Sequence, residues 1–136
     1  MKITIKNLQK KLKIHPEKIR KLVLKILKGE KVKETGWINI CFVDDPVIKK
    51  FNARFHKTKG STDVLAFNLG DQNKVILADI MISADTALKH AKRFKTSAEY
   101  ELYLYIAHGI LHILGFGDHS PAQKKLMRKK ESEYVD

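Results

Sequence analysis

The chain has 136 residues, a length that predicts one domain with a hydrophobic core of its own. Its single cysteine, Cys41, excludes an intramolecular disulfide and favours a reducing compartment. The first residues lack the apolar core of a signal peptide, and the most apolar stretch, Leu102 to Leu114, is too short to span a bilayer. We therefore expect a soluble, cytoplasmic protein without a membrane partner.

Basic residues outnumber acidic residues by 27 to 15, which gives a formal net charge of +12. The lysines concentrate in the first third of the chain and again near its end. A field of this sign attracts polyanions, and RNA is the commonest polyanion of the cytoplasm. A lysine-rich solvated surface of the kind found in heat-adapted proteins is the alternative explanation.

Four short segments have the composition of strands, and five longer segments have apolar residues at helical spacing. Helix starts are marked by proline in the first turn or by a capping residue, and Thr96–Glu99 and Ser120–Gln123 have the spacing of a capping box. The last strand is apolar on both faces, which is typical of a sheet interior. The expected strands are residues 2–6, 37–43, 63–67 and 75–82, and the expected helices are residues 16–29, 45–55, 83–94, 96–115 and a basic terminal helix from residue 120.

These elements predict an α+β fold in a single domain, residues 1–136, with roughly four strands in one sheet and about five helices. No repeat, low-complexity segment or linker rich in Pro, Gly or Ser divides the chain. The order of the strands in the sheet does not follow from these patterns.

Three histidines lie close together near the C-terminus. His108 and His112 are four residues apart in an apolar helical segment, so both imidazoles project from one helix face, and we expect both rings to be buried. Gly115 and Gly117 can end this helix and return the chain toward His119. Three imidazoles suit zinc and leave a fourth position for water, as in catalytic zinc sites. We predict one zinc ion held by these three histidines, with core histidines bonded to the backbone as the alternative.

Residue 109 argues against one class of zinc enzyme. Zinc peptidases of the H-E-x-x-H type carry a glutamate at this position as their general base, and this chain has Gly109. We therefore do not expect peptidase activity by that route.

The histidine segment, including the pair Asp118-His119, resembles the signature of the YbeY family of bacterial metal-dependent endoribonucleases. Segments farther upstream resemble other motifs of that family and occur in the same order. The matching segments are Asn52, Ser61–Phe67, Ala78–Ile80, Glu101 and His108–His119. The resemblance covers most of the chain, and it rests on two independent motifs at the right separation.

This resemblance implies a zinc ion held by three histidines and cleavage of single-stranded RNA. It also implies a role in maturing ribosomal RNA, chiefly at the small-subunit 3′ end, and in ribosome quality control. The implied partners are rRNA and the ribosome, and the implied fold is α+β with a mixed four-stranded sheet.

The spacing of the third histidine departs from the family pattern. His119 lies eleven residues after His108 rather than ten, because Gly117 is extra. Strict counting would place Asp118 in the ligand position, and a carboxylate oxygen is a competent zinc ligand. We favour His119 as the third ligand and keep Asp118 as the alternative ligand or as a catalytic base.

A second departure lies at position 56, where the family usually has an arginine that the resemblance assigns to the scissile phosphate. This chain has His56, with Arg54 two residues earlier and Lys57 next to it. Imidazole cannot copy the bidentate fork of a guanidinium. Either Arg54 or Lys57 contacts the phosphate, or His56 does so as a cation or moves a proton.

Two carboxylates outside the histidine segment need partners. Asp79 interrupts an apolar strand, so it is either a fold-locking group bonded to the backbone or a support for a metal ligand. Glu101 lies two helical turns before His108 on the same face; it is interpreted as an ordinary helix-start glutamate, with support of a metal ligand as the alternative.

We predict metal-assisted hydrolysis of RNA phosphodiesters, with His56, Arg54 and Asp118 as the catalytic residues. One alternative is a non-enzymatic ribosome-assembly factor, in which a structural metal holds the fold and the positive surface binds rRNA. The other is a metallohydrolase that acts on a peptide or another small substrate, against which Gly109 and the basic surface argue.

Overall fold

The computed structural model describes residues 1–33, 36–55, 64–69 and 75–136. Every expected strand and helix is present, and the ends differ from the expected ones by two residues at most. The strands are β1 (Lys2–Asn7), β2 (Gly36–Val43), β3 (Val64–Asn68) and β4 (Ile76–Ser83). The helices are α1 (Pro16–Gly29), α2 (Asp45–Phe55), α3 (Ala84–Phe94), α4 (Ala98–Ile113) and α5 (Pro121–Val135).

The four described strands form one mixed sheet in the order β1-β2-β4-β3. β1 pairs with β2 and β2 with β4 in parallel, whereas β3 pairs with β4 in antiparallel orientation. β4 has a strand on each side, and it contributes Ile80 and Ile82 to the core on one face and Met81 to a smaller cluster on the other, which explains its continuous apolar composition. The predicted α+β fold with a mixed four-stranded sheet is confirmed.

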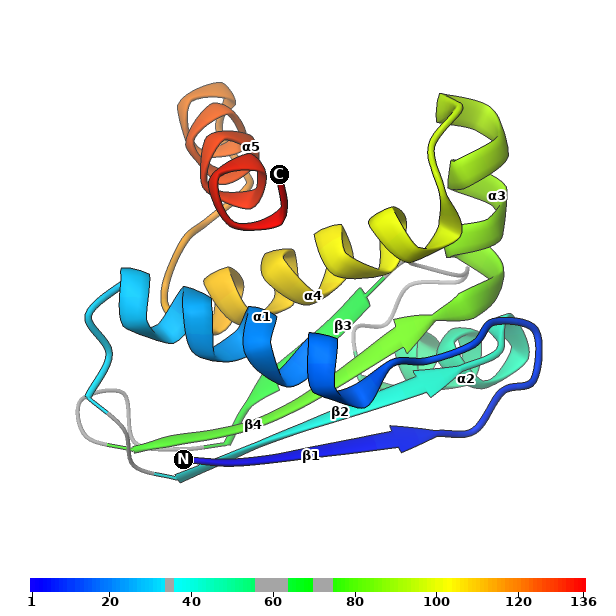
Figure 1. The fold of residues 1–136 in the computed structure, drawn as a ribbon, viewed down its shortest axis with the longest axis horizontal. Coiled ribbons are helices and arrows are strands. Elements are labelled where there is room, and N and C mark those ends of the chain that lie inside the picture. Colours follow the sequence, from blue (N-terminus) through cyan, green and yellow to red (C-terminus); the bar gives the residue numbers. More distant parts are fainter. Residues whose placement is uncertain (34–35, 56–63, 70–74) are drawn as a thin grey trace.

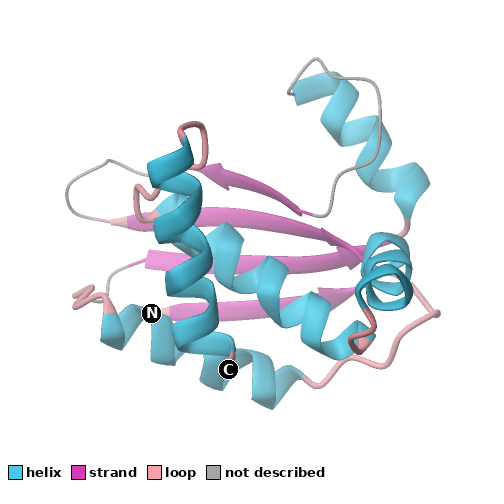
Figure 2. Cartoon of the chain, turned by 90° about the horizontal axis from the view of Figure 1, so that it is seen from above, coloured by secondary structure: helices cyan, strands magenta, loops and turns pink. Residues whose placement is uncertain are grey.

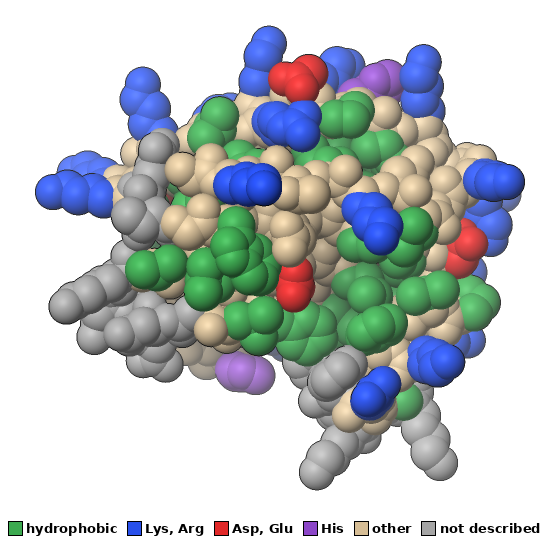
Figure 3. Space-filling model, turned by 90° about the horizontal axis from the view of Figure 1, so that it is seen from below, with side chains coloured by type: hydrophobic (Ala, Val, Ile, Leu, Met, Phe, Trp, Pro, Cys, Tyr) green, Lys and Arg blue, Asp and Glu red, His purple; other side chains and the backbone are tan. Residues whose placement is uncertain are grey.

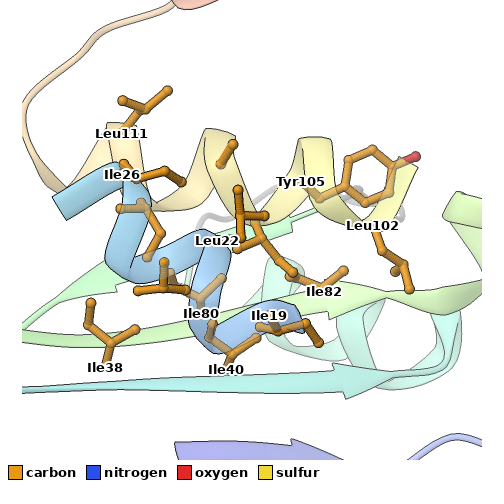
Figure 4. Close-up of a cluster of buried hydrophobic side chains, with 14 of the residues drawn as sticks. Ile19, Leu22, Ile26, Ile38, Ile40, Ile80, Ile82, Leu102, Tyr105 and Leu111 are labelled. Carbon is orange, nitrogen blue, oxygen red and sulfur yellow. The ribbon is translucent and has the colours of Figure 1, made fainter. Parts of the chain in front are cut away.

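Helices α1 and α4 cover one face of the sheet, and α5 lies across them on the outer side (Figures 1 and 2). Side chains alternate between the two faces of each strand, so every second residue of β2 and β4 points toward these helices. Their isoleucines pack against apolar residues of α1 and α4 (Figure 4). The fully buried members of this core include Ile19, Ile26, Ile38, Ile40, Ile80, Ile82, Ile106, Ile110 and Leu111.

Gly109 allows α4 to approach the sheet closely. A Cβ atom at this position would lie 3.2 Å from Cγ2 of Ile80 and 3.3 Å from Cγ2 of Val64. A larger side chain would therefore push α4 away from β3 and β4. The sequence argument against a peptidase gains a structural reason, because this helix face points into the core and has no room for a glutamate.

The opposite face of the sheet is covered in part by α2, whose Ile48 forms a smaller buried cluster with Val43 of β2 and Leu65 of β3. Apolar side chains gather on this face, with lysine and arginine side chains around its rim (Figure 3). A pocket of about 350 Å³ opens here and is lined by Asn39, Cys41, Phe51, Phe67, Leu69, Asp79, Ile80 and Met81. The pocket lies across the sheet from α4.

A network of hydrogen bonds joins the start of α2 to the start of α3. Ser83 caps α3 as predicted, because its Oγ accepts from the backbone N–H of Thr86 at 3.0 Å. The hydroxyls of Ser83 and Thr86 donate to Oδ1 of the buried Asp45 at 2.5 and 3.2 Å. Asp85 in turn accepts from the backbone N–H of Asp45 at 2.6 Å and pairs with Lys11. These two interactions with Asp85 hold its pKa below the usual range.

No helix within the described ranges combines the length and the apolar character that crossing a bilayer requires.

Candidate metal centre

Helix α4 carries two of the three predicted metal ligands, and it begins one residue later than its capping-box pattern suggests. The N-cap is Ser97, whose Oγ accepts from the backbone N–H of Tyr100 at 3.0 Å. Thr96 belongs instead to the end of α3, because its backbone N–H donates to the carbonyl of Ala91 at 3.0 Å. The predicted capping box from Thr96 to Glu99 is therefore wrong.

Glu101 has a structural role at the head of α4. Its side chain is buried, and its Oε2 accepts a hydrogen bond from the hydroxyl of Thr96 at 2.7 Å. This contact ties the end of α3 to the first turn of α4. The interpretation of Glu101 as a helix-start residue agrees with this geometry.

The end of α4 has the local geometry that its glycine predicts. Gly115 adopts a φ of +105°, a conformation that favours glycine. The N–H of Phe116 donates to the carbonyl of Leu111 at 3.0 Å, and the N–H of Gly115 donates to that of His112 at 3.0 Å. These two bonds form a Schellman motif, which ends the helix and turns the chain back.

The segment after this turn is held by the first turn of α5. Oε1 of Gln123 accepts from the backbone N–H groups of His119 and Ser120 at 3.0 and 3.1 Å. Ser120 Oγ accepts from the backbone N–H of Gln123, so the predicted capping box is confirmed. Gly117 lies against the same glutamine, since a Cβ there would be 2.8 Å from its Nε2. The extra glycine therefore occupies a position where the side chain of Gln123 leaves no space.

The histidine rings are more exposed than the sequence predicts. The side chain of His108 is 29% exposed, and His112 and His119 are both exposed. The expectation that the first two rings are buried is wrong, because α4 is not covered on all sides. Its buried residues face α1 and the sheet, whereas residues 104, 108 and 112 form a stripe that is covered only in part.

His108 lies between two carboxylates. Its Nε2 is 3.5 Å from Oδ2 of Asp118, which follows the glycine turn. Its Nδ1 is 3.2 Å from Oε2 of Glu131, which belongs to α5. The structure therefore brings together one predicted ligand, the alternative ligand Asp118, and a carboxylate that the sequence analysis did not single out.

Glu131 could have been found from helical spacing. It lies four residues after Met127 and three before Tyr134, and both of these residues are buried. Residues at this spacing share one helix face, so Glu131 belongs to the inner face of an otherwise basic helix. Its contact with His108 spans 23 positions of the chain, which no local pattern indicates.

One pair of donor atoms at His108 has the chemistry and the spacing of two metal ligands. Two ligands of one tetrahedral ion bound at about 2.0–2.1 Å lie about 3.3–3.4 Å apart, close to the 3.5 Å between His108 Nε2 and Asp118 Oδ2. A carboxylate on the other ring nitrogen is the usual support of a metal-bound histidine. Within the described residues, no group of three or more His, Cys, Asp or Glu side chains is arranged to hold a metal ion. The ligand set His108, His112 and His119 stays a prediction.

The other predicted catalytic residues lie on or after α2. Arg54 is exposed in the last turn of this helix, and Asn52, two residues earlier, is buried. His56 lies outside the described residues, as do Lys57 and the residues 61–63 of the upstream motif. Of the three predicted catalytic residues, the structure places Asp118 next to a predicted metal ligand.

Asp79 lies on the sheet face opposite α4, in the pocket beneath the sheet. Its Oδ1 accepts a hydrogen bond from the side-chain amide of Asn39 on β2 at 3.1 Å. It therefore ties two neighbouring strands through side chains. The two roles expected from the sequence, a bond to the backbone or a support for a metal ligand, do not describe this contact.

Helix α5 adds positive charge beside His108. Four of its cations, Lys124, Lys125, Arg128 and Lys129, are exposed. Lys130 instead binds Glu30 at 3.0 Å, which fixes α5 to the end of α1. The exposed cations form a basic surface on the element that supplies Glu131.

The chain is a small α+β protein. Its helix α4 carries two histidines, packs on a mixed four-stranded sheet and is followed by a glycine turn with a third histidine and by a basic helix. Comparison with known proteins makes the assignment specific. Residues 4–136 match the family described as Endoribonuclease YbeY, and the chain belongs to this family.

Curated relatives and a solved structure agree with this assignment. Endoribonuclease YbeY of Syntrophus aciditrophicus is 39% identical over 140 residues, which cover 98% of this chain and 87% of the relative. Endoribonuclease YbeY of Chloroherpeton thalassium is 37% identical over 119 residues, which cover 88% and 83%. The solution structure of TM1509 from Thermotoga maritima is 25% identical with a TM-score of 0.66, and the match covers 98% of this chain and 86% of that one. The family resemblance of the sequence motifs is confirmed.

Proposed function

We propose that this chain is a metal-dependent endoribonuclease that cleaves single-stranded RNA. Its family membership over residues 4–136 supports the activity, since curated relatives with up to 99% coverage of this chain are named endoribonucleases. The observation that carries the proposal is the geometry at the end of α4, where His108 Nε2 and Asp118 Oδ2 lie 3.5 Å apart beside a basic helix. Its place of action is the maturation of ribosomal RNA, chiefly at the small-subunit 3′ end, and ribosome quality control.

One zinc ion would be held by His108, His112 and His119, with Asp118 as the alternative third ligand. A bound zinc ion lowers the pKa of a coordinated water and polarises a phosphoryl oxygen, which is the chemistry that phosphodiester hydrolysis needs. The exposed rings of His112 and His119 are on the surface, where substrate can reach them. The turn between α4 and α5 is held by Gln123, so its two candidate ligands come from one ordered segment.

The side chains of this protein would bind and orient the RNA. Exposed cations of α5 would contact backbone phosphates, and each contact releases counterions from the RNA. Arg54 or His56 would contact the phosphate that is cleaved. If Asp118 is not a ligand, its carboxylate would accept the proton of the attacking water.

Histidine replacement with metal analysis tests this proposal. Purified protein should contain about one zinc per chain and cut single-stranded RNA, and a chelator should abolish the cutting. His112→Ala should lose both the metal and the cleavage. His15→Ala is the matched control, because His15 lies at the start of α1 without a capping hydrogen bond. Metal-free protein that still cuts RNA would refute the mechanism.

A non-catalytic assembly factor that binds rRNA is the second candidate, because His56 stands where the family usually has an arginine. In that case the wild type and His112→Ala would bind RNA equally well, and neither would cut it. A hydrolase for another substrate class would cut peptides or small esters in an RNA-free panel instead. We place the protein in the cytoplasm with the ribosome as partner, and we treat residues 1–136 as one domain of the family.

A further inference from the structure

Glu131 is an acidic residue on the inner face of the basic helix α5. Its side chain is 15% exposed, and its Oε2 lies 3.2 Å from Nδ1 of His108. Four exposed cations lie on the same helix, and Lys130 next to it binds Glu30 on α1. The carboxylate of Glu131 therefore faces an imidazole, although cations surround it in the sequence.

The docking of α5 brings Glu131 to this place. Tyr134 donates its hydroxyl hydrogen bond to Glu30, and Lys130 binds the same carboxylate at 3.0 Å. Met127 is 2% exposed and joins the main core one helical turn before Glu131. Contacts on both sides of Glu131 thus fix its position relative to α4.

The contact with Glu131 determines which nitrogen of His108 carries the proton. Ionised carboxylates only accept hydrogen bonds, and the ring of His108 faces one on each side, so the closer contact decides. Nδ1 lies 3.2 Å from Glu131 and forms a hydrogen bond with it, whereas Nε2 lies 3.5 Å from Asp118, so the neutral ring carries its proton on Nδ1. Nε2 then keeps its lone pair, and this nitrogen lies on the side of Asp118. A neutral imidazole binds a metal through the nitrogen without a proton, so this tautomer presents Nε2 as the ligand atom.

We propose that Glu131 is a positioning residue that holds the ring of His108 and fixes its Nδ1–H tautomer, so that Nε2 is available to a metal ion. The proposal rests on the proposed function for the identity of that ion. It links metal affinity to the docking of α5, because the same helix carries Glu131 and the basic surface that would contact RNA. Removal of such a carboxylate support lowers metal affinity by about 10–100-fold.

The test compares Glu131→Leu and Glu131→Gln with Glu133→Gln. Glu133 is the matched control, because it lies on the same helix, its side chain is 55% exposed, and the substitution removes the same charge. The first readout is the tautomer of His108 in the metal-free protein, measured by long-range ¹H–¹⁵N NMR about two pH units above the ordinary imidazole pKa of about 6.5. The second readout is the zinc affinity from competition with a chelating dye.

We expect the wild type and Glu133→Gln to show the Nδ1–H tautomer of His108 and equal zinc affinity. Glu131→Leu should show a large share of the Nε2–H tautomer and bind zinc about 10–100-fold more weakly. Glu131→Gln should bind zinc more weakly than Glu133→Gln, because its neutral amide is a weaker acceptor than a carboxylate.

Unchanged tautomer and zinc affinity in the Glu131 variants would overturn the proposal, even if their melting temperatures fall. If Glu131→Leu does not fold, Glu131→Gln decides by the same two readouts. A wild-type protein that binds no zinc would refute the proposed function, and the tautomer measured without metal would still decide whether Glu131 fixes the ring.

Discussion

Replacement of Gly109 by glutamate would create the H-E-x-x-H pattern of zinc peptidases, and we expect it to destabilise the protein strongly rather than to change its chemistry. The Cβ alone would approach Cγ2 of Ile80 to 3.2 Å and Cγ2 of Val64 to 3.3 Å. Over-packing of this kind costs about 1–3 kcal/mol. The loss is offset in part by the better helix propensity of a non-glycine residue, by about 1 kcal/mol.

The carboxylate adds a larger penalty. A charge left without a partner in an apolar interface costs several kcal/mol even after relaxation, on the order of 3–5 kcal/mol. The total is therefore on the order of 5 kcal/mol for Gly109→Glu and about 0–2 kcal/mol for Gly109→Ala. Domains of this size are stable by about 5–15 kcal/mol, so the glutamate variant should lose between about a third and all of its free energy of unfolding.

Urea unfolding followed by far-UV circular dichroism measures these differences. Ser132→Glu on the exposed face of α5 is the control for the introduced charge, with an expected change of about 0.5 kcal/mol or less. A Gly109→Glu variant within about 1 kcal/mol of the wild type would refute the reasoning, because α4 could then not lie against Ile80 and Val64 as described.

Two further predictions concern the α2–α3 junction and the basic helix. The backbone N–H of Asp45 and the ammonium of Lys11 lower the pKa of Asp85 in the folded protein. The ionised carboxylate of Asp85 therefore stabilises the fold at pH values above its unfolded pKa of about 3.9, and this stabilisation is lost as the pH falls through the folded pKa. Asp85→Asn should lower the free energy of unfolding at pH 7 by about 1 kcal/mol, and this free energy should fall less steeply in acid than that of the wild type. Equal urea midpoints of the variant and the wild type at every pH would contradict this prediction. The double variant Lys124→Gln, Lys129→Gln should bind RNA of every sequence more weakly, because two cations that would contact phosphates are lost. The slope of the logarithm of the RNA-binding constant against log[salt] should decrease by about 0.7 for each lost phosphate contact. An unchanged slope would mean that α5 does not contact RNA.

Local patterns were sufficient for the elements and for the ends of the histidine segment. The Schellman motif at Gly115 and the capping box from Ser120 to Gln123 follow from residues within one helical turn of each other. The same holds for the spacing of His108 and His112 on α4. Thr96 shows the limit of such patterns, because its backbone N–H closes α3 instead of opening α4.

The sequence by itself determined the α+β class, the elements, and the histidine segment that identifies the family, because these depend on periodicity and on hydrogen bonds between near neighbours. Only the tertiary structure decided the strand order, the exposure of His112, and the position of His108 between Asp118 and Glu131. Which face of α4 is covered depends on how α1, α5 and the sheet pack around it. Contacts between distant segments arise from that packing, and the order of residues along one helix does not contain them.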